Sequence, residues 1–195
     1  TLEEYRRLLD ASAQHTQAIL TVAMNTGMRK AEILGLRWSH IDRDKRMIRL
    51  PAELTKERKP KSIPINSNVR RVLEAQRFAT RSCDHDFVFV YEGKPMRYIS
   101  KAVVGACRRA DIPYGRSLEY VFVFHDIRRT VKTYMTRAGV EKAYRDVILG
   151  HSLRGMDVYY LKPSDEDLHS AMEKYTAWLE TEIANVDQTV DQAAP

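Results

Sequence analysis

The sequence has little of the material from which disulfide-rich, membrane or zinc-binding domains are built. Its two cysteines, Cys83 and Cys107, lack the CxxC spacing of a zinc site and are interpreted as reduced thiols. No apolar run approaches the ~18 residues that a membrane helix needs, and the N-terminus has no secretory signal pattern. Eight glycines and seven prolines are too few for a fibrous or largely disordered chain.

The apolar content and the periodicity of the sequence are typical of one globular domain. Apolar residues make up 44% of the 195 positions, which is enough for a hydrophobic core. Helical periodicity dominates, and alternation is confined to short stretches near the middle of the first half. We therefore expect a mainly α fold with a small antiparallel β-sheet (α+β), in which residues 1–180 form the domain and residues 186–195 a disordered tail.

Charge is distributed unevenly along the chain. Residues 164–195 contain eight acidic residues and one base, Lys174, whereas the preceding 163 residues contain 31 Lys and Arg against 18 Asp and Glu. Residues 1–163, the body of the chain, therefore carry a net charge of +13, although the whole chain carries +6. So basic a body is typical of proteins with a polyanionic partner. On composition alone, ordinary solubilising charge remains the alternative.

Periodicity and capping residues predict the individual elements. The expected helices span residues 1–13, 16–25, 67–78, 99–110, 125–138, 141–149 and about 164–185. The expected strands span residues 47–50, 53–55 and 62–65, and a lysine-rich hairpin joins the last two. Residues 120–124 are either a short strand or a buried approach to the next helix. The helix from residue 164 has an apolar stripe and an acidic face, so it should dock on its own domain or on a neighbouring copy.

Six residues from separate segments form a basic set around one phenol: Arg29, Lys56, His125, Arg128, His151 and Tyr160. Arginine is suited to a bidentate grip on phosphate. A tyrosine oxygen is a weak nucleophile because its pKa is ~10, but packed positive charge lowers that pKa. Such a set suits phosphoryl transfer through a covalent phosphotyrosine. Each residue alone has an ordinary structural explanation, so the hypothesis depends on their joint occurrence.

Four motifs in order resemble the catalytic domain of the tyrosine recombinase (phage integrase) family. TGMRKAEILGLRW resembles the first box, with Arg29 as the catalytic arginine and Glu32 as its supporting acid. LTKERKPKSIPI resembles the β-hairpin segment, with Lys56 as the catalytic lysine. The resemblance covers about residues 1–180, including the C-terminal helix, and the family's N-terminal core-binding domain is not expected within this chain.

The remaining two motifs supply the other half of the expected site. HDIRRT resembles the H-x-x-R box and gives His125 and Arg128. LGHSLRGMDVYY resembles the last box and gives His151 and, nine residues on, the nucleophile Tyr160. The resemblance implies that this tyrosine attacks a scissile DNA phosphate, which leaves a 3′-phosphotyrosine and a free 5′-hydroxyl. Energy conserved in the ester makes ATP, a metal ion and any other cofactor unnecessary.

The resemblance also implies a role for each residue and a set of partners. Arg29 and Arg128 would hold the non-bridging oxygens, and His151 would donate a further hydrogen bond. Lys56 would protonate the leaving 5′-oxygen, and His125 would help to take the tyrosine proton. Further DNA contacts are expected from the basic residues around the site, namely Arg58, Lys59, Lys61, Arg129 and Lys132. The expected partners are a double-stranded recombination site and further copies in a tetrameric synapse, with the C-terminal helix passed in trans, in the cytoplasm at the nucleoid and away from membranes.

Three alternatives remain open on sequence grounds. A type IB topoisomerase shares this chemistry, but its usual second-box residue is a lysine, so His125 argues against it. A DNA-binding module without activity would keep the basic surface and could lose Tyr160 or Arg29, both of which are present. A zinc site made by His125, His151 and Cys83 has no supporting spacing.

Overall fold

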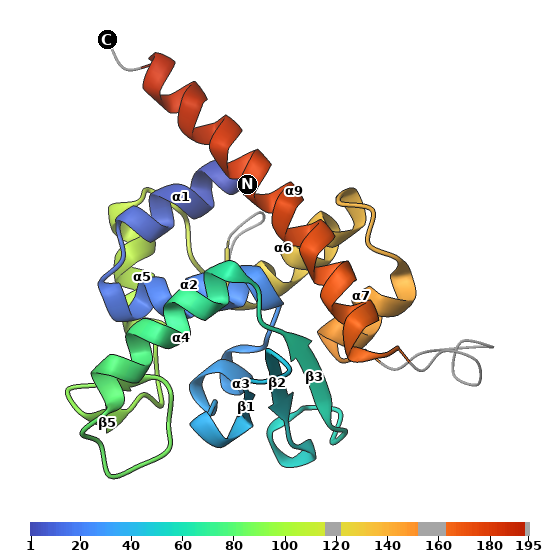
Figure 1. The fold of residues 1–195 in the computed structure, drawn as a ribbon. Helices are drawn as coiled ribbons and strands as arrows, with labels where there is room; N and C mark the ends of the chain where they lie inside the picture. The colour runs from blue at the N-terminus through green and yellow to red at the C-terminus, as the bar shows by residue number, and fades with distance from the viewer. Residues whose placement is uncertain (116–121, 152–162, 194–195) are drawn as a thin grey trace.

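The computed structural model describes residues 1–115, 122–151 and 163–193, which form a mainly helical fold with small antiparallel sheets (Figure 1). The helices are α1 (Leu2–Asp10), α2 (Gln14–Thr26), α3 (Lys30–Leu34), α4 (Ser67–Thr80), α5 (Ser100–Arg109), α6 (Phe124–Arg137), α7 (Lys142–Leu149) and α9 (Asp165–Ala193). α1 begins with a capping box, in which the Thr1 hydroxyl accepts the Glu4 N–H and the Glu4 carboxylate accepts from the Thr1 amino group. The predicted fold class is therefore confirmed.

One three-stranded sheet lies below α2 and α4 in Figure 1 and carries the lysine-rich hairpin. Its order is β1 (Ile41–Asp42), β2 (Met47–Leu50) and β3 (Lys61–Pro64), and both pairings are antiparallel. Ile48 lies opposite Ile63, and both side chains are fully buried, so this register is fixed by the core. A second sheet pairs β4 (Val90–Tyr91) with β5 (Lys94–Pro95).

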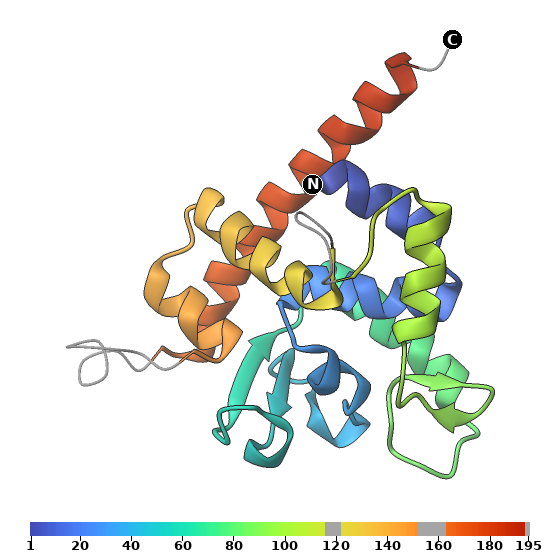
Figure 2. The same cartoon turned by 180° about the vertical axis from the view of Figure 1, so that it is seen from behind.

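α2 is the central helix of the core. Its apolar residues Ile19, Leu20 and Val22 have no exposed surface, and it contacts α1, α3, α4 and α6. α4 and α9 lie toward the viewer in Figure 1, whereas α6 lies toward the viewer in Figure 2. The two faces of the molecule are therefore covered by different helices.

The C-terminal helix α9 packs on its own domain. Its residues Leu168, Met172 and Tyr175 are at most 2% exposed, and the Tyr175 hydroxyl donates to the Met24 carbonyl of α2 at 2.7 Å. The helix continues to Ala193, beyond the predicted end near residue 185, so most of the segment expected as a disordered tail is helical. Among the described helices, none combines the length and apolar character of a membrane span.

One local prediction differs from the structure. The segment around residues 53–55 is a 3-10 helix, Ala52–Leu54, and not a strand. The backbone N–H groups of Leu54 and Thr55 donate to the carbonyls of Pro51 and Ala52, each at 3.2 Å, and the Thr55 hydroxyl lies 3.0 Å from the Ala52 carbonyl, so the chain turns here and does not extend. Of residues 120–124, the described part holds a bridge between Phe122 and Tyr114, and Phe124 already begins α6.

Candidate active site

A glycine turn between α2 and α3 places Arg29. α2 ends at Gly27, whose φ of +63° is a left-handed conformation that glycine adopts without strain. A Cβ added there would lie 2.4 Å from a methyl group of Leu149, so the turn packs directly against α7. Arg29 then occupies the N-cap of α3, where Glu32 accepts both its backbone N–H and its Nη1, each at 3.0 Å.

Glu32 is shared between Arg29 and a buried lysine. Lys61 donates from Nζ to Glu32 Oε2 at 3.0 Å, and the two side chains are 3% and 1% exposed. Burial lowers the pKa of Lys61 to about 8, against the opposing effect of Glu32. Burial favours the protonated form of Glu32, but Lys61 and Arg29 together hold its pKa below its usual range. Lys61 was expected to contact DNA from the hairpin, yet it is turned inward and its ammonium does not reach the surface.

Arg128 of α6 lies between the ends of two helices. It is 5% exposed, and its Nη1 donates to the Gly27 carbonyl at 2.8 Å. Its Nη2 donates to the Leu149 carbonyl and lies 3.2 Å from His151 Nε2. Both carbonyls belong to helix C-termini, where the helix dipole favours a cation. Burial and the charge of Arg29 lower the pKa of Arg128 to about 10, so it remains charged at neutral pH.

His151 follows the C-cap of α7 and is oriented by Asp146. Its backbone N–H donates to the Asp146 carbonyl at 2.7 Å, and its Nδ1 lies 3.4 Å from Asp146 Oδ1. Burial lowers the pKa of His151, although the Asp146 contact acts in the opposite direction, so the ring is neutral at neutral pH. A proton on Nδ1 would then face Asp146 and leave Nε2 to accept from Arg128. Sequence reasoning missed Asp146, although a carboxylate one helical turn before the histidine was visible.

Glu57 covers the outer edge of Arg29. It lies on the turn between β2 and β3, and its two oxygens accept from Arg29 Nη1 at 2.9 Å and Nη2 at 2.5 Å. The two side chains are 17% and 27% exposed. A planar carboxylate in this forked contact takes the edge of arginine that a phosphate would use. Nothing in the sequence singled out Glu57, because it sits within a lysine-rich hairpin.

The other predicted residues lie around this centre or outside the described chain. Lys56 is exposed on the turn that carries Glu57. His125 is exposed in the first turn of α6, where burial and the nearby charges of Arg128, Arg129 and Arg29 lower its pKa. The remaining predicted DNA contacts Arg58, Lys59, Arg129 and Lys132 are all exposed. Tyr160 falls within residues 152–162, outside the described part of the chain.

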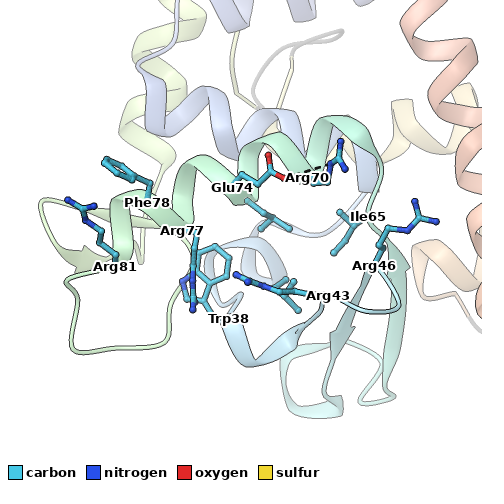
Figure 3. Close-up of a pocket in the computed structure, with 11 residues that line it drawn as sticks. Trp38, Arg43, Arg46, Ile65, Arg70, Glu74, Arg77, Phe78 and Arg81 are labelled. Carbon is cyan, nitrogen blue, oxygen red and sulfur yellow. Dashed lines mark ion pairs between the residues drawn. The ribbon is translucent and has the colours of Figure 1, made fainter.

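Two other kinds of functional site were sought in the described residues, a metal site and a surface hollow. Within the described residues, no group of three or more His, Cys, Asp or Glu side chains could hold a metal ion. A hollow of about 660 Å³ lies between α4 and the β1–β2 turn, lined by Trp38, Phe78 and five arginines (Figure 3). None of the five predicted catalytic residues that the structure describes lines this hollow, so it is separate from the arginine pair.

Comparisons with known sequences identify a protein family. The model of the phage integrase family matches residues 1–167. The integrase of Salmonella phage P22 is 29% identical over 151 residues, which cover 70% of this chain and 36% of that protein. A XerC-like tyrosine recombinase of Caldanaerobacter subterraneus is 26% identical over 187 residues, covering 77% of this chain and 46% of that protein. The chain thus spans less than half the length of these two relatives.

Solved structures show the same fold. The XerA recombinase superposes with a TM-score of 0.64 at 20% identity, covering 90% of this chain and 64% of that one. A lambda integrase fragment (75–356), solved as a dimer bound to a core site, superposes with a TM-score of 0.63 at 15% identity, covering 84% and 61%. The described residues therefore have the fold of tyrosine recombinase catalytic domains. With the family model matching most of its length, this chain belongs to the phage integrase family.

Proposed function

We propose that this chain is the catalytic part of a site-specific tyrosine recombinase that cuts and rejoins DNA through a covalent 3′-phosphotyrosine. The observation that carries the proposal is the convergence of Arg29, Arg128 and His151 from three separate segments of the chain. The forked contact of Glu57 on Arg29 supports it further, since it shows an anion-binding edge already in use. The chain's family and fold are those of enzymes with this chemistry.

In the proposed reaction, the two arginines hold the scissile phosphate and Tyr160 attacks it. Arg29 becomes available when Glu57 withdraws, and Arg128 is already fixed by two backbone carbonyls. The tyrosine oxygen bonds to phosphorus, and the bond from phosphorus to the 5′-oxygen breaks. Both arginines then face a phosphorus centre whose negative charge has increased, which is where fixed cations accelerate a reaction.

Two proton transfers complete the step. His125 has a lowered pKa, so at neutral pH it is a neutral base that can take the Tyr160 proton. Lys56 is exposed on the β2–β3 turn and would give a proton to the leaving 5′-oxygen. Attack by the 5′-hydroxyl of an incoming strand reverses both transfers and releases the tyrosine, so the reaction consumes no ATP.

The proposed partner is a double-stranded recombination site. The lambda integrase and Tn1549 transposon integrase structures that resemble this chain were solved with DNA, and the exposed Arg58, Lys59, Arg129 and Lys132 would extend a basic surface beside the arginine pair. Assembly as a tetramer on paired sites in the nucleoid is part of the proposal. Because α9 buries its apolar residues Leu168 to Leu179 on its own domain and packs Ile183 and Val186 against the same core, any contact of its apolar stripe in trans would use residues beyond Val186.

A pool of nicked duplexes with randomised sequence tests the proposal, because it does not require that the target site be identified first. A nick next to the scissile phosphate lets the short 5′-hydroxyl fragment diffuse away, so the covalent adduct accumulates. The chain should form an adduct that survives SDS, and sequencing of the attached DNA should reveal a preferred site. Adding a strand with a matching 5′-hydroxyl should release the adduct as joined DNA. DNA binding with no adduct over the whole pool would contradict the proposal.

A further inference from the structure

Lys61 was expected to contact DNA, but its side chain is buried, and the proposed proton transfers do not use it. It stands at the first position of β3, paired with Leu50 of β2, and its side chain points into the body of the protein. Its stem packs on the C-cap of α7, since a Cβ added to Gly150 would lie 3.0 Å from Lys61 Cδ. A lysine is rarely buried to this degree unless it is paired, and here the pair is with Glu32.

The Lys61 ammonium and the Arg29 guanidinium are held by the same carboxylate. Glu32 Oε2 accepts from Lys61 Nζ and from the Arg29 backbone N–H, while Oε1 accepts from Arg29 Nη1, all at 3.0 Å. A carboxylate that is 1% exposed stays ionised only when it is paired. If Lys61 were neutral or absent, Glu32 would take up a proton or reorient, and the side chain of Arg29 would lose its inner anchor.

The electrostatic balance of the site also depends on Lys61. The charges of Arg128 and Arg29 both lower the pKa of Lys61, so the three cations are close enough to interact. Once Glu57 withdraws, the two arginines and Lys61 stand against Glu32 alone, which leaves a net charge of +2. A phosphodiester carries one negative charge and gains a second when a tyrosinate attacks it. The Lys61 ammonium is therefore placed to stabilise the doubly charged transition state more than the singly charged phosphodiester of bound DNA.

We propose that Lys61 is a positioning residue for strand cleavage: its buried ammonium holds Glu32 as a carboxylate, which fixes Arg29 toward the phosphate, and adds positive charge beneath the arginine pair. The inference rests on the proposed function. It assigns the two lysines of the hairpin to different tasks, because the exposed Lys56 reaches the leaving group whereas Lys61 touches neither DNA nor the reacting atoms.

The test compares Lys61→Met with Lys59→Met, which removes an exposed lysine two residues away in the same hairpin. On a nicked substrate recovered from the pool, the dissociation constant for DNA and the rate of adduct formation at saturating DNA are measured separately. Lys61→Met should bind DNA within about twofold of the parent chain and form the adduct more slowly by on the order of 100-fold. Lys59→Met should raise the dissociation constant for DNA and lower its salt dependence.

A double variant separates positioning from folding. Lys61→Met alone leaves a buried, unpaired carboxylate and could unfold the domain, whereas Lys61→Met/Glu32→Gln removes both charges and should keep a cooperative thermal transition. The double variant should still be slow at saturating DNA. A double variant that cleaves at the parent rate would overturn the inference, and so would a Lys61→Met protein that loses only DNA affinity. If the parent chain itself forms no adduct, the proposed function fails instead.

Discussion

Replacing Glu57 by glutamine should make the site bind DNA more tightly. In the free protein the Glu57 carboxylate makes two charge-assisted hydrogen bonds to Arg29, at 2.9 and 2.5 Å. A scissile phosphate needs the same edge of that guanidinium, so this contact must break first. When only a small fraction of a protein is in the binding-competent state, its apparent affinity for the ligand is reduced by that fraction. Removing the competing Glu57 carboxylate should therefore raise the apparent affinity for DNA.

The size of the effect follows from the exposure of the pair. Hydrogen bonds to charged groups contribute roughly 1.5–3 kcal/mol when protected from solvent, while fully exposed ion pairs contribute about 0–1 kcal/mol. With side chains that are 17% and 27% exposed, we expect about 1–2 kcal/mol for the contact. Since 1.4 kcal/mol is a factor of ten, Glu57→Gln should lower the dissociation constant by about 5- to 30-fold.

A matched variant isolates this effect from the change in net charge. Glu53 lies four residues earlier in the same hairpin and is exposed, so Glu53→Gln removes one negative charge without touching Arg29. Fluorescence anisotropy with a labelled duplex, at one fixed salt concentration, measures both variants. Glu57→Gln should bind several-fold more tightly than Glu53→Gln, and equal affinities for the two variants would refute the competitor role of Glu57.

Three further predictions concern stability, ionisation and the conditions of the reaction. Gly27→Ala should lower the free energy of unfolding by more than about 2 kcal/mol, because it combines a positive φ with a 2.4 Å contact to Leu149. Gly139→Ala, where φ is +73° and nothing lies within 4 Å, should cost about 1 kcal/mol; equal losses in thermal unfolding would contradict the packing argument. Asp146→Asn should lower the pKa of His151 further, since the carboxylate contact raises it, and an NMR titration showing a rise would be inconsistent with the geometry. Cleavage of the nicked substrate should persist in EDTA, whereas DNA affinity should fall steeply between ~50 and ~200 mM salt; loss of cleavage with binding intact would indicate a metal requirement.

Much of the helical framework could be predicted from local sequence. The apolar stripe of residues 125–138 predicted a helix that the structure places at Phe124–Arg137, and the helix predicted over residues 141–149 is α7, which ends at the left-handed Gly150. These features depend on residues one or two turns apart, which a sequence displays directly. The 3-10 helix Ala52–Leu54 was missed because the contact between the Thr55 hydroxyl and the Ala52 carbonyl, which supports this turn, is not evident in the sequence.

The chemistry of the hairpin could not be predicted in the same way. Lys56, Arg58, Lys59 and Lys61 look alike in sequence, and all were assigned to catalysis or DNA contact. Lys61 is the buried one, because its side chain lies on the inward side of β3 and pairs with Glu32, which is 29 residues away in the sequence. The contact between Glu57 and Arg29 is likewise formed across 28 residues. Long-range pairs of this kind require the fold before they can be recognised.

The most direct test of the proposed reaction is to identify the amino acid that becomes attached to DNA. Adduct trapped on a nicked substrate would be digested with protease and nuclease, and the modified peptide sequenced by mass spectrometry. Tyr159 and Tyr160 are adjacent, so on a helix they would point about 100° apart and one alone could attack in line. The modification should map to Tyr160, Tyr160→Phe should bind DNA without forming an adduct, and Tyr159→Phe should still form it. DNA attached to Tyr159, or an adduct formed by Tyr160→Phe, would contradict the proposed mechanism.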